Sequence, residues 1–334
     1  MNIERKRLRI GFIGAGGIAA RHVGVLSGME DITIVGVADP DFARAADLAG
    51  RLGGRAYNFH ADLIAMESLD AIYICIPPFA HGEVEAAVIA AGLPFFVEKP
   101  LSLNIASAEC IAQQVKERGI ITAVGYHWRY LDIVEEARGL LEGNPAALVV
   151  GHWLDRTPPP QWWWHQDSSG GQIVEQATHI IDLARHLVGE VVEVYAQGAQ
   201  TAPRSDFLGL DIATATAATL RFASGTVATL SATCLLGWGH RTGIHLYCDG
   251  MAIELSDREI MVDVGRGRPV RHAQGDPVER EDRDFLDAVR GLPNRIRSPY
   301  GEALNTHRVA LAIAQSVLSG LPVSIEPARE TADA

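Results

Sequence analysis

The chain has 334 residues, which is enough for roughly two domains of ~150 residues each. Apolar residues make up 48% and charged residues 21%, as in globular proteins and unlike disordered or fibrous ones. The 29 basic and 41 acidic residues give a net charge of −12, so the surface repels phosphate groups and we expect no nucleic-acid or membrane partner.

The N-terminal segment is charged and leads directly into a strand-like run, without the apolar core or cleavage site of a secretory signal. No run approaches the ~18 apolar residues of a membrane-spanning helix. The four cysteines lie far apart and include no CxxC pair. These features predict a cytoplasmic protein with reduced cysteines.

Short, almost wholly apolar runs alternate with helix-like segments along residues 1–125. Such runs are typical of strands that are covered on both faces. They occupy 8–14, 32–39, 71–77, 94–98 and 121–126, and helical spacing of apolar residues marks 18–26, 42–52, 84–91 and the surroundings of 111–115. The alternation predicts βαβ units, so we expect a doubly wound α/β domain with a parallel sheet over 1–125.

The pattern changes in residues 126–334. A long helix is expected over 173–187, and strand-like runs follow in series at 191–200, 212–222, 226–235, 243–248 and 251–255. Two helices near 280–290 and 302–319 are expected to close the chain. Strands in series without intervening helices indicate an antiparallel or mixed sheet, so the second domain is predicted to be α+β.

A glycine-rich turn joins the first predicted strand to the first helix. Residues 14–19 read Gly-Ala-Gly-Gly-Ile-Ala, a GxGxxA pattern. Gly14 permits the tight turn, and Gly16 lets the backbone approach a pyrophosphate. Backbone N–H groups at the helix start, around Gly17 and Ile18, favour a bound anion. The turn predicts a dinucleotide site.

Asp39 ends the second predicted strand, 23 residues after Gly16. An acidic residue at this spacing accepts hydrogen bonds from the ribose hydroxyls of the adenosine half. The alternative is that Asp39-Pro40-Asp41 forms only a turn with a helix cap. No arginine follows at once to receive a 2′-phosphate, so NAD is favoured over NADP.

Three further motifs stand at predicted strand ends or at the start of the long helix. They are Cys75-Ile76-Pro77-Pro78 with His81, Glu98-Lys99-Pro100, and the run GGQIVEQATHIID over 170–182. Together with the GxGxxA turn, these motifs resemble the Gfo/Idh/MocA family of sugar and polyol oxidoreductases. The resemblance extends over nearly the whole chain, down to the predicted terminal helix.

The resemblance implies an N-terminal Rossmann domain that binds NAD and a C-terminal domain with an open, largely antiparallel sheet. In such proteins the sheet commonly packs against a neighbouring subunit, so we expect a homodimer or homotetramer. Lys99 and His179 match the lysine and histidine that flank nicotinamide and substrate. The cofactor contacts that we expect in addition are Ile76, Pro77, His81, Glu98 and Trp163.

The sequence departs from the family pattern at two positions. Glu175 stands where an aspartate is usual, four residues before His179. The longer side chain repositions the proton relay or selects a different hydroxyl. Trp164 stands where a Trp-Arg pair would often sit, which puts one cofactor or substrate contact in doubt.

The proposed chemistry is the oxidation of a secondary alcohol. His179 suits the base because an imidazole titrates near neutral pH, and Lys99 can stabilise the developing alkoxide. Glu175 and His179 are four residues apart, so on one helix they share a face, where Glu175 can orient the imidazole or bind a hydroxyl. The alternatives are a solvated polar stripe on this helix and a surface lysine beside Pro100.

Five of the six tryptophans lie between residues 128 and 164. These tryptophans form either a flat surface that binds a carbohydrate or ordinary packing and subunit contacts, and the sequence leaves both roles open. We expect Trp153 and His127 to contact substrate, with structural roles as the alternative. The histidines and cysteines lack the spacing of metal ligands, so no metal is expected.

The leading hypothesis is an NAD-dependent oxidoreductase that acts on a secondary hydroxyl or ketone of a sugar, polyol or keto-sugar. One alternative is a glycosidase that retains its NAD and uses transient oxidation followed by elimination. A second alternative is a non-catalytic sensor of dinucleotide or sugar.

Overall fold

The computed structural model describes residues 7–201 and 205–326. Contacts between Cα atoms divide the chain into two compact units. Unit 1 comprises Met1–Tyr130 and Asp276–Leu304, and unit 2 comprises Leu131–Gly275 and Asn305–Ala334. This division differs from the single boundary predicted after residue 125, because the segment 276–304 is grouped with the first unit.

In the described part of unit 1, six strands form one sheet in the order β3-β2-β1-β4-β5-β6. Every pairing in it is parallel, which confirms the predicted doubly wound sheet. The strands are β1 (Leu8–Ile13), β2 (Ile32–Ala38), β3 (Arg55–Tyr57), β4 (Ala71–Ile74), β5 (Phe95–Val97) and β6 (Thr122–Val124). The short β3, with its polar first residue, lacked the apolar run that revealed the others.

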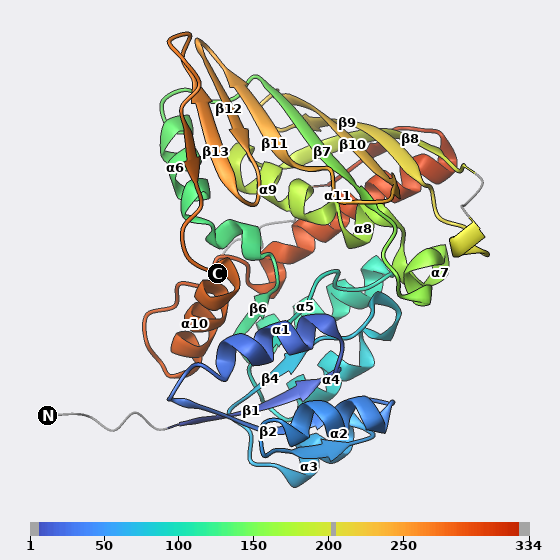
Figure 1. Ribbon diagram of the computed structural model, residues 1–334, viewed down its shortest axis with the longest axis vertical. Helices are drawn as coiled ribbons and strands as arrows, with labels where there is room; N and C mark the ends of the chain where they lie inside the picture. The colour runs from blue at the N-terminus through green and yellow to red at the C-terminus, as the bar shows by residue number, and fades with distance from the viewer. Residues whose placement is uncertain (1–6, 202–204, 327–334) are drawn as a thin grey trace, which may run out of the picture. The chain divides into compact units, whose positions relative to one another are not determined.

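Helices cover both faces of this sheet, which is why its strands are almost wholly apolar. One buried cluster joins the sheet to α1, α2 and α10, and another joins it to α4, α5 and the first turn of α11. Figure 1 shows these helices and the connecting α3. Their bounds are α1 (Gly17–Leu26), α2 (Phe42–Gly50), α3 (His60–Met66), α4 (Glu83–Ala90), α5 (Ile105–Arg118), α10 (Pro277–Val289) and α11 (Tyr300–Ser319).

The described strands of unit 2 form a nine-stranded sheet in the order β14-β13-β12-β11-β7-β10-β9-β8-β15. Within it β7 and β10 run parallel and the other pairings are antiparallel, which confirms the predicted open, largely antiparallel sheet. The strands are β7 (Leu148–Arg156), β8 (Val191–Ala199), β9 (Ala215–Phe222), β10 (Val227–Leu236), β11 (Arg241–Cys248), β12 (Met251–Leu255), β13 (Glu259–Asp263), β14 (Val270–His272) and β15 (Val323–Ser324).

Helices lie along one face of this sheet and leave the other face exposed (Figure 1). The covering helices are α6 (Asp132–Leu141), α9 (Thr178–Val188) and the later turns of α11, where Ser316 Oγ accepts a 2.9 Å hydrogen bond from the Ala196 N–H of β8. Buried and exposed residues therefore alternate along β9 and β10. No helix in the described residues is long and apolar enough to cross a membrane.

Candidate functional site

The glycine-rich turn after β1 has the geometry of an anion site. Gly14 has φ 96°, and a Cβ added there would overlap the carbonyl oxygen of Cys75, so this position requires glycine. Gly16 caps the start of α1 without a side-chain acceptor, and no atom approaches the Cβ positions of Gly16 or Gly17 within 4 Å. The first N–H groups of α1, from Gly17 and Ile18, are thus open to a ligand, and this cradle fits a pyrophosphate.

Asp39 lies directly after β2, and its carboxylate holds the glycine turn. One oxygen accepts a 2.8 Å hydrogen bond from the Ala15 N–H, and the other accepts one of 2.8 Å from the Asp41 N–H. The cap of α2 is Asp41, which also pairs with Arg44 at 3.2 Å. The two aspartates therefore have separate tasks, and contact of Asp39 with a ribose stays a prediction.

The turn after β4 is built around His81. Its Nδ1 lies 2.5 Å from Oε1 of Glu85, whose Oε2 accepts a 2.6 Å hydrogen bond from the Gly82 N–H at the start of α4. Burial acts to raise the pKa of Glu85, but His81 and the Gly82 N–H outweigh it and the net pKa is lowered. The turn that contains Ile76 and Pro77 is thereby held at the carboxyl end of β4, and the cofactor contacts predicted there stay predictions.

The Glu98-Lys99-Pro100 motif follows β5 at the same edge of the sheet. Glu98 is 4% exposed and Lys99 is partly exposed, since successive side chains alternate in direction. The Glu98 N–H donates a 2.9 Å hydrogen bond to the Ile74 carbonyl oxygen of β4, and the Lys99–Pro100 peptide is cis. This edge holds the carboxyl ends of β1, β4 and β5, where ligands bind in doubly wound sheets.

Sequence reasoning missed the partners of Glu98. His22 on α1 places Nε2 3.0 Å from Glu98 Oε1, and its Nδ1 lies 2.8 Å from Oδ1 of Asp282 on α10. Burial acts to lower the pKa of His22, but Asp282 and Glu98 outweigh it and raise the pKa well above 6.5. The signal in the sequence was a histidine on the apolar face of the first helix, beside Val23 and Leu26.

His127 begins the 3₁₀ turn His127–Tyr130 directly after β6, within the same unit. Its pKa is lowered to about 4, mainly by burial; Glu98 opposes this change and Lys99 adds to it. The imidazole is neutral at neutral pH, so it can donate one hydrogen bond and accept another. Its predicted contact with substrate stays a prediction.

In unit 2 the predicted long helix over 173–187 is wrong. The structure has two helices, α8 (Gln172–Glu175) and α9 (Thr178–Val188), separated by two residues. The Ala177 N–H donates five residues back to the Gln172 carbonyl, and the His179 N–H donates only three back to Gln176. The turn widens and then tightens, so the helical period is lost and Glu175 and His179 do not share one helical face.

The Glu175 carboxylate is held by a tryptophan. Its Oε2 accepts a 2.7 Å hydrogen bond from Nε1 of Trp163, which lies in the 3₁₀ turn Gln161–Trp164 and is 1% exposed. Trp163 packs with Leu210, Ile212 and Cys234, and Trp162 and Trp164 lie against the same cluster. The structure thus gives these tryptophans packing roles, and contact of Trp163 with a cofactor stays a prediction.

His179 lies in the first turn of α9 and is 5% exposed. Its ring stacks on Trp153 of β7, with 5.8 Å between centroids and 22° between planes. One turn further along, Asp182 accepts a 2.8 Å hydrogen bond from Thr306 of α11. His179 and Asp182 are buried, so the solvated-stripe alternative fails for this helix. The predicted substrate contacts of Trp153 and His179 stay predictions.

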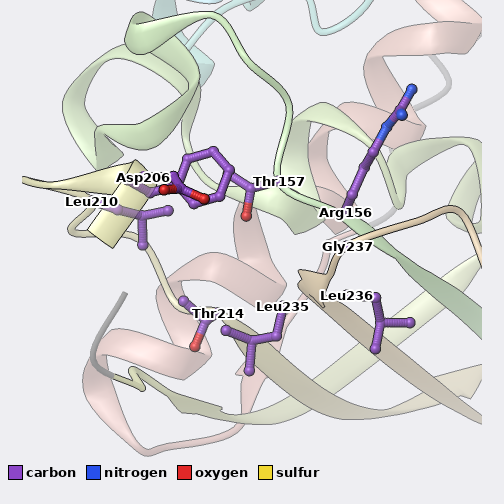
Figure 2. Close-up of a pocket in the computed structure, with 9 residues that line it drawn as sticks. Arg156, Thr157, Asp206, Leu210, Thr214, Leu235, Leu236 and Gly237 are labelled. Atoms are coloured by element: carbon purple, nitrogen blue, oxygen red, sulfur yellow. The ribbon is translucent and has the colours of Figure 1, made fainter. Parts of the chain in front are cut away.

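Two cavities lie among the described residues of unit 2. The first, of ~170 Å³, lies at the ends of β7 and β10, and Arg156 at its rim extends away from the leucines and threonines of the wall (Figure 2). The second, of ~210 Å³, adjoins the segment Gly170-Gly171-Gln172. Neither of these two cavities is lined by Glu175 or His179.

The sequence matches two family models. The oxidoreductase family with NAD-binding Rossmann fold, GFO/IDH/MocA, matches residues 8–126, and the GFO/IDH/MocA C-terminal domain matches residues 143–254. The two matches together cover about two thirds of the chain.

Curated proteins and solved structures show similarity over nearly the full length. The uncharacterized oxidoreductase YrbE of Bacillus subtilis is 28% identical over 96% of this chain and 97% of its own. The myo-inositol 2-dehydrogenase of Thermotoga maritima is 28% identical over 95% of this chain and 90% of its own. A levoglucosan dehydrogenase in complex with NADH and levoglucosan has the same fold, with TM-score 0.86, 20% identity and coverage of 96% of this chain and 100% of that one.

Proposed function

The chain belongs to the Gfo/Idh/MocA oxidoreductase family, and on that basis we propose that it is an NAD-dependent dehydrogenase or reductase acting on a secondary hydroxyl or ketone of a polyol or sugar. The observation that carries the proposal is the placement of Lys99 directly after β5, at the sheet edge that also holds the glycine turn and Asp39. The names of the inositol and levoglucosan dehydrogenases support this substrate class.

The cofactor is held by unit 1. The open N-terminus of α1 receives the pyrophosphate, and Asp39 accepts hydrogen bonds from the ribose hydroxyls. Its negative charge repels a 2′-phosphate, and the guanidinium of Arg44 is already paired with Asp41, so NAD is preferred to NADP. When bound, the nicotinamide accepts or supplies the hydride.

Lys99 and His179 handle the substrate proton and charge. His179 takes the hydroxyl proton in the oxidation and returns it in the reduction. Lys99 donates to the reacting oxygen and stabilises its negative charge. Glu175, whose Oε2 accepts the indole hydrogen bond of Trp163, binds a neighbouring hydroxyl of the substrate through its carboxylate, which acts as a hydrogen-bond acceptor.

The test is absorbance at the NADH wavelength with purified protein, NAD and a panel of inositols, aldoses and glycosides. Stoichiometric NADH with one or a few compounds is the expected result. NAD binding without NADH release, together with hydrolysis of a chromogenic glycoside, would replace the proposal by a glycosidase with retained NAD. NAD binding without any turnover would replace it by a sensor.

Assembly and location are further parts of the proposal. The exposed face of the unit 2 sheet carries Tyr195, Thr229, Ser231 and Tyr247, and we propose that it pairs subunits into a dimer or tetramer. In light scattering, Ser231→Arg is expected to reduce the measured mass to that of a monomer, while Gln113→Arg, on the exposed side of α5, leaves the mass unchanged. A wild-type monomer would contradict this.

A cytoplasmic location, testable by cell fractionation, is proposed from the sequence alone.

A further inference from the structure

Unit 1 contains a cluster of four ionisable side chains that the proposed chemistry does not use directly. His22, Glu98, Glu281 and Asp282 are each at most 4% exposed, and Phe96 meets the His22 ring edge to face at 4.8 Å between centroids. Oxygen atoms of Glu98 and Glu281 and a ring nitrogen of His22 lie within 4.8 Å of one another. A buried charged cluster of this kind is costly unless its groups neutralise one another.

The hydrogen bonds define the charges in the cluster. Both ring nitrogens of His22 face carboxylate oxygens, at 2.8 Å to Asp282 and 3.0 Å to Glu98, so both must carry hydrogen if the carboxylates are ionised. Glu281 has no hydrogen-bond partner for either oxygen among the described residues, and burial raises its pKa well above 4.5. The geometry fits an imidazolium at His22 that donates to Asp282 and to Glu98, while burial favours a proton on Glu281.

This pairing fixes Glu98 from two sides. His22 holds the carboxylate from α1, and the backbone of Gly125 lies against it, since a Cβ at that position would overlap the Glu98 carboxylate. The Gly125 N–H also donates a 3.0 Å hydrogen bond to the Val97 carbonyl oxygen. The Glu98 side chain therefore has little freedom, and the backbone that continues into Lys99 is held with it.

We propose that His22 is a positioning residue, which acts through Glu98 and with the support of Asp282 to fix the turn that presents Lys99 to the substrate. The inference rests on the proposed function, because it assumes that Lys99 touches the reacting oxygen. A group that stabilises developing charge must be held accurately, and a displacement of about 1 Å can cost roughly 100-fold in rate. A lysine side chain is flexible, so its backbone anchor is the part that the protein can hold rigidly.

The experiment compares kcat, the Kd of NAD and the melting temperature of His22→Gln, Glu98→Gln and the double variant. Each single change is expected to lower kcat by about 10- to 100-fold, while the double variant falls no more than about twofold further, because both changes break the same link. The matched control is Arg21→Gln. It removes the Arg21–Asp276 ion pair between the same two helices, α1 and α10, without touching Glu98, and should leave kcat unchanged.

A purely structural role predicts a different result. In one case the melting temperatures of the variants would fall, while kcat measured well below those temperatures stayed at the wild-type value. In the other case the double variant would lose kcat by the product of the two single losses. Either outcome overturns the inference. If His22→Gln does not fold, Asp282→Asn removes one charge but keeps an acceptor for His22, and it should still lower kcat; unchanged kcat in a folded Asp282→Asn would equally overturn the inference.

Two further measurements separate the possible failures. Full activity in Lys99→Met would refute the proposed function itself, whereas loss of activity there with unaffected His22 variants would refute only the positioning role. Elemental analysis tests the charge assignment. A stoichiometric transition metal that is lost in Glu281→Gln would show that a metal ion, and not protons, balances these carboxylates, and would overturn the assignment.

Discussion

Nε1 of Trp163 donates a 2.7 Å hydrogen bond to Oε2 of Glu175. The carboxylate is thus attached to the buried aromatic cluster of unit 2, and its orientation depends on a residue 12 positions earlier in the chain. In this chain the acid before His179 is held by an indole, which the helical spacing did not suggest.

Replacing Trp163 tests this attachment. Trp163→Phe keeps the aromatic packing but removes the donor, so we expect kcat/KM for the substrate to fall about tenfold, as for loss of a hydrogen bond to a charged group. Trp164→Phe is the control, because its indole donates at 2.9 Å to the Pro158 carbonyl and not to Glu175. Equal effects of the two changes would show that Glu175 does not need its indole partner.

Replacing Lys99 tests the charge-stabilising role. Lys99→Met preserves the length of the side chain but removes its charge, so kcat should fall by about 100- to 1000-fold while the Kd of NAD changes less than about threefold. Calorimetry measures the binding and NADH absorbance measures the turnover. Lys116→Met, on the exposed side of α5, serves as the control and should behave as wild type. A matching loss of NAD affinity would assign Lys99 to cofactor binding instead.

Replacing Asp39 tests the preference for NAD. Asp39→Asn keeps a hydrogen-bond acceptor but removes the charge, so we expect the affinity for NAD to weaken about tenfold and the discrimination against NADP to shrink. Asp41→Asn, which retains the cap of α2, should leave both affinities unchanged. Titration of NAD and NADP against each variant gives the ratio of the two affinities. An unaltered ratio in Asp39→Asn would refute the assignment of Asp39 as the residue that selects NAD.

The buried cluster predicts how stability depends on pH. The pKa of His22 is raised above 6.5 and that of Glu281 above 4.5, so the folded state binds more protons than the unfolded state. The stability contributed by each group is present below its unfolded pKa and is lost as pH rises through its folded pKa. We therefore expect the contribution of this cluster to the free energy of unfolding to decrease as the pH rises above the ordinary pKa values of these groups, 4.5 for Glu281 and 6.5 for His22.

Glu281→Gln isolates one of these groups. The amide imitates the neutral acid and cannot ionise in the unfolded state, so the decrease in stability with pH should be shallower than in wild type. Urea unfolding at several pH values measures the slope. Glu279→Gln, two residues earlier and on the exposed side of α10, should keep the wild-type slope. Parallel curves for Glu281→Gln and wild type would show that Glu281 is ionised in the folded protein.

The sequence by itself determined the NAD-binding sheet and the residues at its edge. Continuous apolar runs between helical segments leave few alternatives to a parallel sheet, and Gly14 is demanded by a local backbone conformation that glycine alone adopts readily. The motif Glu98-Lys99-Pro100 was visible because it follows such a run. The strands of unit 2 were found where apolar residues were dense and missed where polar residues interrupt them, as in β7.

Only the tertiary structure decided the partners of these residues. Asp282 reaches His22 across 260 positions of the chain, from a predicted helix whose own sequence does not indicate which distant residue Asp282 will meet. The break between α8 and α9 likewise depends on packing, because nothing in the local propensity of residues 172–179 forbids a continuous helix. Local spacing specifies which groups are near each other along one element, whereas hydrogen bonds between elements depend on how distant segments pack, and that is where His22 and Trp163 acquired their roles.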